Sequence, residues 1–248
     1  MRLVTEGLQL SGTGTLRRQL YMLLQQQLLT GVWPGGALLP SSRILASDLK
    51  LSRNTVNQVL QQLVAETEAG DLHIIGEKGR EQIEVEARIN FDNIDQLELT
   101  LEAKGNAAVL VARNKEQVSF GYVDNASIDL VVRVPERFAL KLEDGSGDTR
   151  VEGLNGDLLI ADGSGNLQVS GGRQVTIEDG SGNLSLAQTT GNVSIDDGSG
   201  DIDVSQMSGN LAIVDGSGAI KVTDIQGNIV IDDGSGSIAV ANVLGAVT

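Results

Sequence analysis

Asp144-Gly145-Ser146-Gly147 is the first of six identical tetrapeptides in the C-terminal part of this 248-residue chain. The other copies begin at Asp162, Asp179, Asp197, Asp215 and Asp233. The steps between successive copies are all 18 residues except one of 17, from Asp162 to Asp179. So constant a period indicates one structural unit stacked on itself. We therefore expect a regular repeat domain over residues 141–248.

Each repeat contains two short segments in which a pair of apolar residues is separated by one residue, as in Ile202/Val204 and Leu211/Ile213. Alternation of this kind, bounded by Gly, Asn, Asp and Ser, is typical of a strand with one buried face. Two strands per repeat predict one coil of a flattened β-solenoid, with about 4.8 Å between coils. No aromatic residue follows Phe138, so we expect an interior of Val, Ile and Leu that is too thin to enclose a ligand.

The two turns of the predicted coil differ. One turn carries an apolar residue in four repeats, namely Leu154, Met207, Ile225 and Val243. We expect these side chains to plug that edge. At the other edge lie the first glycines of the tetrapeptides, such as Gly163 and Gly198. We expect a tight glycine turn there, in which a positive φ is affordable. The 17-residue step predicts a local irregularity near Gly171–Arg173 on the plugged edge.

The repeated aspartates allow two interpretations. Calcium-binding solenoids carry the nonapeptide Gly-Gly-x-Gly-x-Asp-x-U-x. Aligning Gly-Ser-Gly with that pattern places Ile, Leu or Thr where the ligand Asp should stand. Turn aspartates commonly accept a backbone N–H of their own turn. We expect this second role for each Asp, and we predict no metal site and no cofactor.

Composition limits the classes of protein to consider. The chain has no cysteine, which excludes disulfides and thiolate metal sites. No run approaches 18 consecutive apolar residues, and residues 1–14 contain no apolar run of signal-peptide length. We therefore expect no membrane span and a cytoplasmic location.

The net charge of −15 is unevenly distributed. Residues 1–66 carry six Lys or Arg and three Asp or Glu, which gives +3, whereas residues 67–248 carry −18. A basic front on an acidic body is typical of a module that faces nucleic acid. The acidic remainder would have to project away from DNA.

The first 66 residues are predicted to be helical. Leucines from Leu16 to Leu28 recur at helical spacing before Gly31, which predicts a first helix. A second is expected from Ser41 or Ser42 to about Lys50, and a third, with Ser52 as its cap, from Arg53 to about Glu66. Short helices joined in this way predict a helix-turn-helix domain over residues 1–66.

The same segment resembles the winged helix-turn-helix of the GntR regulators, and most of all their MocR-like branch. The resemblance rests on Leu39-Pro-Ser-Ser-Arg43 and Ser52-Arg-Asn-Thr-Val56. It implies that Arg53, Asn54, Thr55 and Asn57 begin a recognition helix that contacts bases. It also implies that Arg43 and Ser52 bind phosphates of double-stranded DNA.

Two features depart from that family. Many members carry Arg at the position of Asn57, and the β-hairpin wing expected after Glu66 has no clear counterpart. Residues 76–80 could form a substitute wing, but we expect this segment to belong to the next domain. The pyridoxal-phosphate domain of MocR-like proteins is replaced here by the repeats, so that cofactor is not expected. His73, the chain's one histidine, is expected to be a surface residue rather than a catalytic base.

Residues 67–140 alternate without repeating and are predicted to form irregular strands, the first coils and the N-terminal cap of the solenoid. Val132-Arg-Val-Pro-Glu-Arg-Phe138, followed by the tetrapeptides, resembles the "putative adhesin" family of bacterial repeat proteins. The resemblance runs from about residue 70 to the end. That family is mostly linked to the cell envelope and has no catalytic residues to transfer.

The sequence thus predicts an α segment followed by an all-β solenoid, and it leaves two functions open. The first is a dimeric GntR-type transcription regulator that uses its solenoid for oligomerisation, anchoring or sensing. The second is a structural or adhesin-like solenoid whose front domain does not bind DNA. No nucleophile–base pair or metal cluster occurs at workable spacing, so an enzyme is not expected. Nothing near Thr248 resembles a cap, so the final edge either continues in a longer chain or pairs with another copy.

Overall fold

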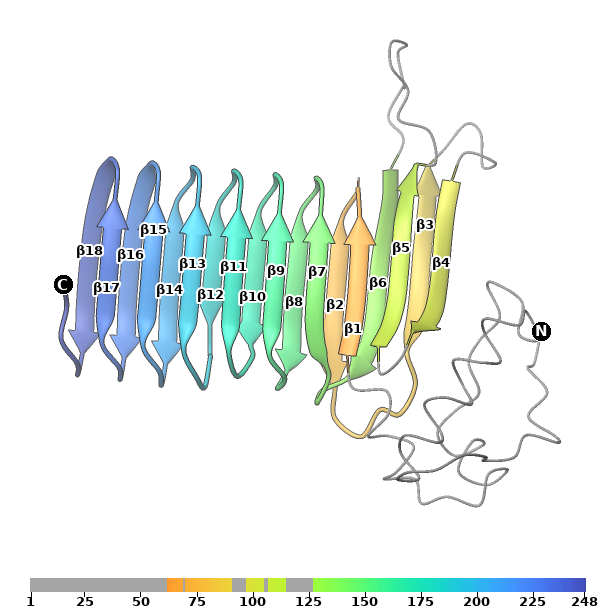
Figure 1. Cartoon of the computed structure of the whole chain (residues 1–248), viewed down its shortest axis with the longest axis horizontal. Coiled ribbons are helices and arrows are strands. Elements are labelled where there is room, and N and C mark those ends of the chain that lie inside the picture. The colour runs from red at the N-terminus through yellow and green to blue at the C-terminus, as the bar shows by residue number, and fades with distance from the viewer. Residues whose placement is uncertain (1–61, 69, 91–96, 105–106, 115–126) are drawn as a thin grey trace, which may run out of the picture.

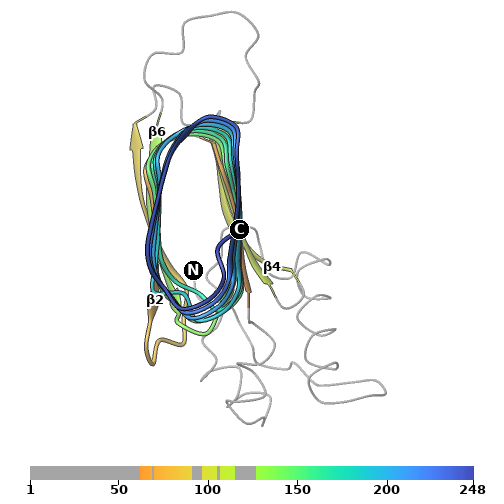
Figure 2. The ribbon, with the colours of Figure 1, turned by 90° about the vertical axis from the view of Figure 1, so that its left-hand side faces the viewer.

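The computed structural model describes residues 62–68, 70–90, 97–104, 107–114 and 127–248. These residues form 18 strands in two nine-stranded sheets. The strands stack side by side along one axis (Figure 1), and a view along that axis shows the coils superimposed as a flattened oval (Figure 2). The predicted two-strand-per-coil β-solenoid is therefore confirmed.

The first sheet has the spatial order β17-β15-β13-β11-β9-β7-β1-β5-β4. Its strands are β1 (Gln62–Thr67), β4 (Leu97–Lys104), β5 (Ala107–Asn114), β7 (Ala139–Asp144), β9 (Leu158–Asp162), β11 (Val175–Asp179), β13 (Val193–Asp197), β15 (Leu211–Asp215) and β17 (Ile229–Asp233).

The second sheet has the order β18-β16-β14-β12-β10-β8-β2-β6-β3. Its strands are β2 (Leu72–Glu77), β3 (Glu84–Asn90), β6 (Ser127–Pro135), β8 (Thr149–Leu154), β10 (Leu167–Gly171), β12 (Leu184–Ala187), β14 (Ile202–Met207), β16 (Gly218–Ile225) and β18 (Gly236–Val243).

The core lies between the two sheets and follows from the apolar pairs of the repeat. Neighbouring strands are parallel and in register, so that Ile177 pairs with Ile160 on one side and with Ile195 on the other. All three are buried, while the residues between the apolar pairs face solvent. Stacking the same side chain in every coil keeps the Val, Ile and Leu interior continuous along the solenoid.

The edge predicted to be plugged by apolar residues is confirmed at three of the four positions, and we call it the apolar edge. The fourth residue, Val243 in the last coil, is only partly buried. Leu154, Met207 and Ile225 are each only 1% exposed. The residue before the plug adopts a left-handed conformation, as Gln206 (φ 57°) and Asp224 (φ 60°) show. The pairing of β10 with β8 shifts register between Ser170 and Gly171. The predicted irregularity beside the 17-residue step is therefore also confirmed.

The opposite edge, formed by the Asp-Gly-Ser-Gly turns, is called the Asp edge. In this glycine turn the second glycine, and not the first, adopts the positive φ, as in Gly165 (129°) and Gly182 (135°). The first glycine is required for a different reason. A Cβ on Gly163 would lie 2.5 Å from the carbonyl oxygen of Gly145 in the neighbouring coil.

Asparagine and aspartate side chains outside the core link successive coils. The Oδ1 atom of Asn192 accepts the backbone N–H of Asn210, and Asn210 in turn accepts from Asn228. A second ladder runs along Asp148, Asn166 and Asn183. These bonds satisfy turn N–H groups that would otherwise lack a protein partner.

The predicted third helix, from Arg53 to about Glu66, is wrong for its last residues. Residues 62–67 form strand β1, which is paired in parallel with β5 on one side and β7 on the other. Leu63 is buried in the solenoid core together with Ala65. Pairing on both sides outweighs the helical propensity of Gln, Leu, Ala and Glu in this segment.

The first coils are arranged out of chain order. The coil made by β1 and β2 lies between the β5–β6 coil and the β7–β8 coil. Strands β3 and β4 then pair antiparallel with β6 and β5 at the N-terminal end of the stack. Strand β2, which contains residues 72–77, is thus part of the solenoid. The expectation that this segment belongs to the second domain is confirmed.

Candidate functional site

The residues predicted to contact DNA lie outside the part of the chain that the structure describes. They are Arg43, Ser52, Arg53, Asn54, Thr55 and Asn57. The helix-turn-helix prediction for the residues before Gln62 also lies there. Their roles remain predictions, and the described residues offer two other features with functional potential, a polar hollow and a row of buried carboxyls.

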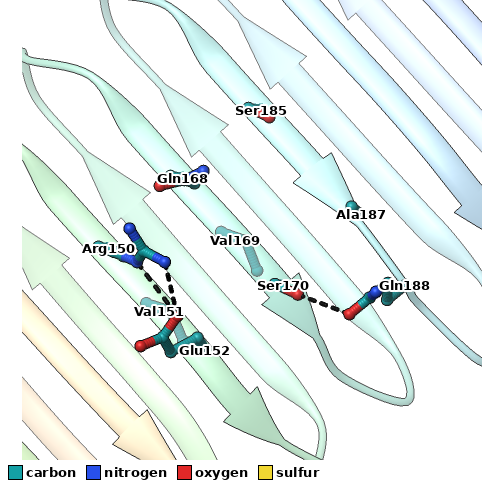
Figure 3. Close-up of a pocket in the computed structure, with 9 residues that line it drawn as sticks. All are labelled: Arg150, Val151, Glu152, Gln168, Val169, Ser170, Ser185, Ala187 and Gln188. Atoms are coloured by element: carbon teal, nitrogen blue, oxygen red, sulfur yellow. Dashed lines mark hydrogen bonds and ion pairs between the residues drawn. The ribbon is translucent and has the colours of Figure 1, made fainter.

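The polar hollow is a depression of about 200 Å³ on the outer face of β8, β10 and β12 (Figure 3). It is lined by Arg150, Val151, Glu152, Gln168, Val169, Ser170, Ser185, Ala187 and Gln188. Arg150, Gln168 and Ser185 occupy one row across the three strands, and Glu152, Ser170 and Ala187 occupy the next. The small side chains Ser170, Ser185 and Ala187 leave the space open.

Four polar side chains of the hollow are already paired with one another. The guanidinium of Arg150 donates to Glu152 Oε2 at 2.8 and 3.2 Å, and Ser170 donates to Gln188 at 3.0 Å. The hydrogen bond from Arg150, supported by His73, lowers the pKa of Glu152. A ligand with neutral polar groups could fit, but Gln188 is not a base that could activate Ser170.

His73 lies beside the hollow on β2, with its Nε2 atom 2.9 Å from Glu152 Oε1. The ring is partly exposed, as expected for a surface residue. No described serine hydroxyl hydrogen-bonds to it, so the described residues contain no Ser–His pair for acyl transfer. Neither this contact nor the hollow could be predicted from the sequence, because His73 and Glu152 are 79 positions apart and the lining comes from three strands that share no motif.

The row of buried carboxyls runs along the Asp edge and consists of the repeated aspartates Asp144, Asp162, Asp179, Asp197, Asp215 and Asp233. We call it the Asp row. Each member pairs in register with the next, from β7 through to β17. The first five are 2–6% exposed. Thr67 of β1 occupies the same position in the preceding coil and donates a 2.6 Å hydrogen bond to Asp144.

The prediction that each Asp accepts a backbone N–H of its own turn is confirmed at four positions. Asp144 accepts from Gly145, and Asp197, Asp215 and Asp233 accept from the serine two residues further on. Neither oxygen of Asp162 or Asp179 has a hydrogen-bond partner. The N–H groups of their own turns nevertheless act to lower the pKa of both residues, against the larger effect of burial.

Burial raises the pKa of the five innermost members of the row. The effect is large at Asp162, where burial and then the charges of Asp144 and Asp179 raise the pKa to about 7. Burial and the charges of Asp179 and Asp215 raise the pKa of Asp197 to about 6. The pKa values of Asp144, Asp179 and Asp215 are raised as well, chiefly by burial.

The described residues contain no group of three or more His, Asp or Glu side chains arranged to hold a metal ion. In the same part of the chain, no helix has the length and apolar character that crossing a bilayer requires. The Asp row is therefore a one-dimensional stack of carboxyls rather than a cluster that converges on one point.

Comparison with known proteins links the chain to two families. The model of the bacterial regulatory proteins of the gntR family matches residues 16–69. The model of the Toastrack DUF4097 family matches residues 60–243. The two matches overlap over residues 60–69, which include β1. Neither family is one of enzymes.

Among solved structures, the chain is similar to one described as a "putative cell adhesion protein" from Clostridium sporogenes ATCC 15579. The sequences are 12% identical, the TM-score is 0.45, and the similarity covers 75% of this chain and 94% of the other. No curated protein matches the chain. The Toastrack match spans well over half of the 248 residues and coincides with the solenoid described above. The chain belongs to the Toastrack DUF4097 family.

Proposed function

We propose that this protein is a DNA-binding transcription regulator of the GntR type. The observation that carries the proposal is the match of the GntR family to residues 16–69, which include both motifs that the sequence analysis singled out. The excess of positive charge in residues 1–66 supports it, because phosphate contacts depend on Lys and Arg. We place this activity in the cytoplasm, where a bacterial regulator meets DNA.

Six residues would form the DNA interface. Arg53, Asn54, Thr55 and Asn57 would present their side chains to base edges in the major groove, since they begin the expected recognition helix. Arg43 and Ser52 would bind phosphates and so fix the position and orientation of that helix on the DNA duplex. With a net charge of only +3 per front segment, tight binding needs two copies on neighbouring half-sites.

The solenoid would supply the oligomerisation, anchoring or sensing that accompanies DNA binding. The overlap of the two family matches over residues 60–69 supports close coupling, because it leaves no linker between the DNA-binding match and β1. Strand β1 is paired on both sides within the first sheet. Because β1 belongs both to the DNA-binding match and to the solenoid, a change in the stability of the solenoid would directly affect the end of the DNA-binding segment.

The test is selection of a randomised duplex pool on the full-length protein, at about 50 mM and about 200 mM salt. We expect a palindromic motif that survives the higher salt concentration. Arg53→Ala should abolish its enrichment, because it removes a base contact. Arg173→Ala is the matched control, since it removes one positive charge from an exposed position on the solenoid. Sedimentation of the complex with the selected duplex should show two chains per site.

A second candidate is a structural or adhesin-like solenoid that does not bind DNA. The observation that favours it is the net charge of −18 on residues 67–248, which repels phosphate. In that case the selection would yield no motif, or only salt-sensitive binding that Arg53→Ala and Arg173→Ala weaken equally. Either result would contradict the regulator proposal.

A further inference from the structure

The Asp row has a geometry that cannot hold a charge on every member. Adjacent strands of a sheet lie about 4.8 Å apart, so in-register carboxyls repeat at roughly that distance. Asp162, Asp179 and Asp197 are consecutive members, and each is at most 5% exposed. Like charges at this spacing repel strongly where water is excluded, and each ion also loses its hydration.

No described cationic side chain offsets these charges. No described Lys, Arg or His forms an ion pair with a member of the row. Both oxygens of Asp162 and of Asp179 are buried without a partner, as is Oδ2 of Asp197 and of Asp215. Burial without a partner or counter-ion disfavours the charged form of a carboxyl, most of all where its neighbours in the row are also charged.

The surroundings of the row add hydroxyls and further negative charge. At the β1 end, Asp144 accepts from the hydroxyls of Thr67 and Thr149 at 2.6 and 2.8 Å, so that this member has partners for both oxygens. At the β17 end, Asp215 also feels the negative charges of Asp233 and Asp201. The Asp144 end of the row is thus better suited to charge than the interior positions, whereas the neighbouring charges disfavour ionisation of Asp215.

We infer that the Asp row is a proton-binding array, in which interior carboxyls alternate between protonated and ionised forms at mildly acidic pH, and Asp162 keeps its proton in part up to neutral pH, so that the solenoid takes up protons when it folds. Asp162 and Asp197 are the protonated members, each between two ionised neighbours. The raised pKa values of these two residues agree with this assignment. Alternation removes every nearest-neighbour repulsion among Asp144, Asp162, Asp179, Asp197 and Asp215.

The consequence is a fold that loses stability as the pH rises from acidic to neutral values. A carboxyl whose pKa is higher in the folded chain stabilises the fold below the unfolded pKa, and that contribution is lost as the pH rises through the folded pKa. The ordinary aspartate value is 3.8, and the folded values are about 7 and about 6 for Asp162 and Asp197. The loss therefore begins above about pH 4 and is complete soon after about pH 7, so a comparison of pH 5 with pH 8 captures much of it.

The first experiment measures urea unfolding of the full-length protein at about pH 5 and about pH 8. For the wild type we expect the folding equilibrium constant to fall by about 100-fold or more over this range. Asp197→Asn keeps the shape of the protonated side chain and cannot ionise. Its pH dependence should be about tenfold smaller than that of the wild type.

Asp196→Asn is the matched control, because residue 196 is adjacent in sequence but exposed on the outer face. It should keep the full pH dependence of the wild type. Equal pH dependence in the wild type and in Asp197→Asn would overturn the inference. So would a folding equilibrium constant that does not fall between the two pH values.

The second experiment observes the protons directly by infrared spectroscopy at about pH 7. The carbonyl stretch of a protonated carboxyl is separate from the carboxylate bands. We expect this band in the wild type, a weaker band in Asp162→Asn, and no change in Asp196→Asn. A wild-type protein without the band, whose stability at pH 8 rises on addition of sodium or calcium chloride, would show that cations neutralise the row and would overturn the inference.

Discussion

The two edges of the coil close the same gap between the sheets with opposite chemistry. At the apolar edge, Leu154, Met207 and Ile225 fill the turn with hydrocarbon, and the plug differs from coil to coil. At the Asp edge, all six coils carry the same four residues, and the buried group is a carboxyl. An inward-packing side chain at the apolar edge can be any of several apolar residues. At the Asp edge the backbone of each turn contacts the turns of the neighbouring coils, and this contact restricts the sequence to the same residues in every coil.

The largest effect that separates the two edges is expected from Gly182→Ala at the Asp edge. Gly182 has a φ of 135°, and its added Cβ would overlap the carbonyl oxygen of Gly165 in the neighbouring coil. Strain and overlap together should destabilise the fold by about 4 kcal/mol or more. Urea unfolding of the full-length protein measures the loss.

Gly79→Ala is the control that separates strain from overlap. Gly79 also has a positive φ, of 76°, but nothing lies within 4 Å of an added Cβ. It should cost only about 1–2 kcal/mol, which is the price of a left-handed residue. If the two alanine variants were equally stable, contact between the turns of successive coils would not be what restricts the Asp edge to glycine.

A smaller loss is expected from Ile225→Ala at the apolar edge. Ile225 is 1% exposed, so truncation removes buried hydrocarbon and leaves a cavity, at a cost of about 2–4 kcal/mol. Val230→Ala is the control, since Val230 is 54% exposed on β17 and should change stability by less than about 0.5 kcal/mol. Ile225→Val should recover most of the loss. Thermal unfolding of the three variants would show whether the apolar edge tolerates change in shape but not in volume, and equal losses for Ile225→Val and Ile225→Ala would contradict this.

The smallest effect is expected from the ladder of asparagines outside the core. Asn210→Ala removes the acceptor for the backbone N–H of Asn228, which is 2.9 Å from Asn210 Oδ1. The net loss of one exposed hydrogen bond should be about 0.5–1.5 kcal/mol. Ser194→Ala, an exposed position on β13, serves as the reference for a neutral surface change. A loss above that of Ile225→Ala would mean that side-chain ladders, rather than core packing, hold the coils together.

Local periodicity was sufficient to predict the regular coils. The spacing of Ile202, Val204, Leu211 and Ile213 placed two strands in each repeat, and the structure buries all four side chains. The plugs at Leu154 and Met207 could be predicted for the same reason, since each is a property of one short segment. The left-handed φ at the second glycine of the tetrapeptide could not, because both glycines of Asp-Gly-Ser-Gly are free to adopt it.

The pairing of strands that are distant in the chain could not be predicted from the sequence. Residues 62–67 have good helical propensity, and only the gap between β5 and β7 makes them a strand. Nothing local indicates that the β1–β2 coil lies out of chain order, or that β3 and β4 reverse direction at the end of the stack. The DNA-binding assignment of Arg53 and its neighbours, in contrast, rests on sequence motifs alone.

By itself, the sequence determined the period of the solenoid, the inward-facing apolar pairs and the family resemblance of each part. All three depend only on residues that are close together in the chain. Only the tertiary structure decided the environment of the repeated aspartates. Asp196 and Asp197 are chemically identical neighbours, yet one faces water and the other is 2% exposed beside two further carboxyls. Burial and charge spacing are properties of stacked coils, so a single repeat read in isolation cannot reveal them.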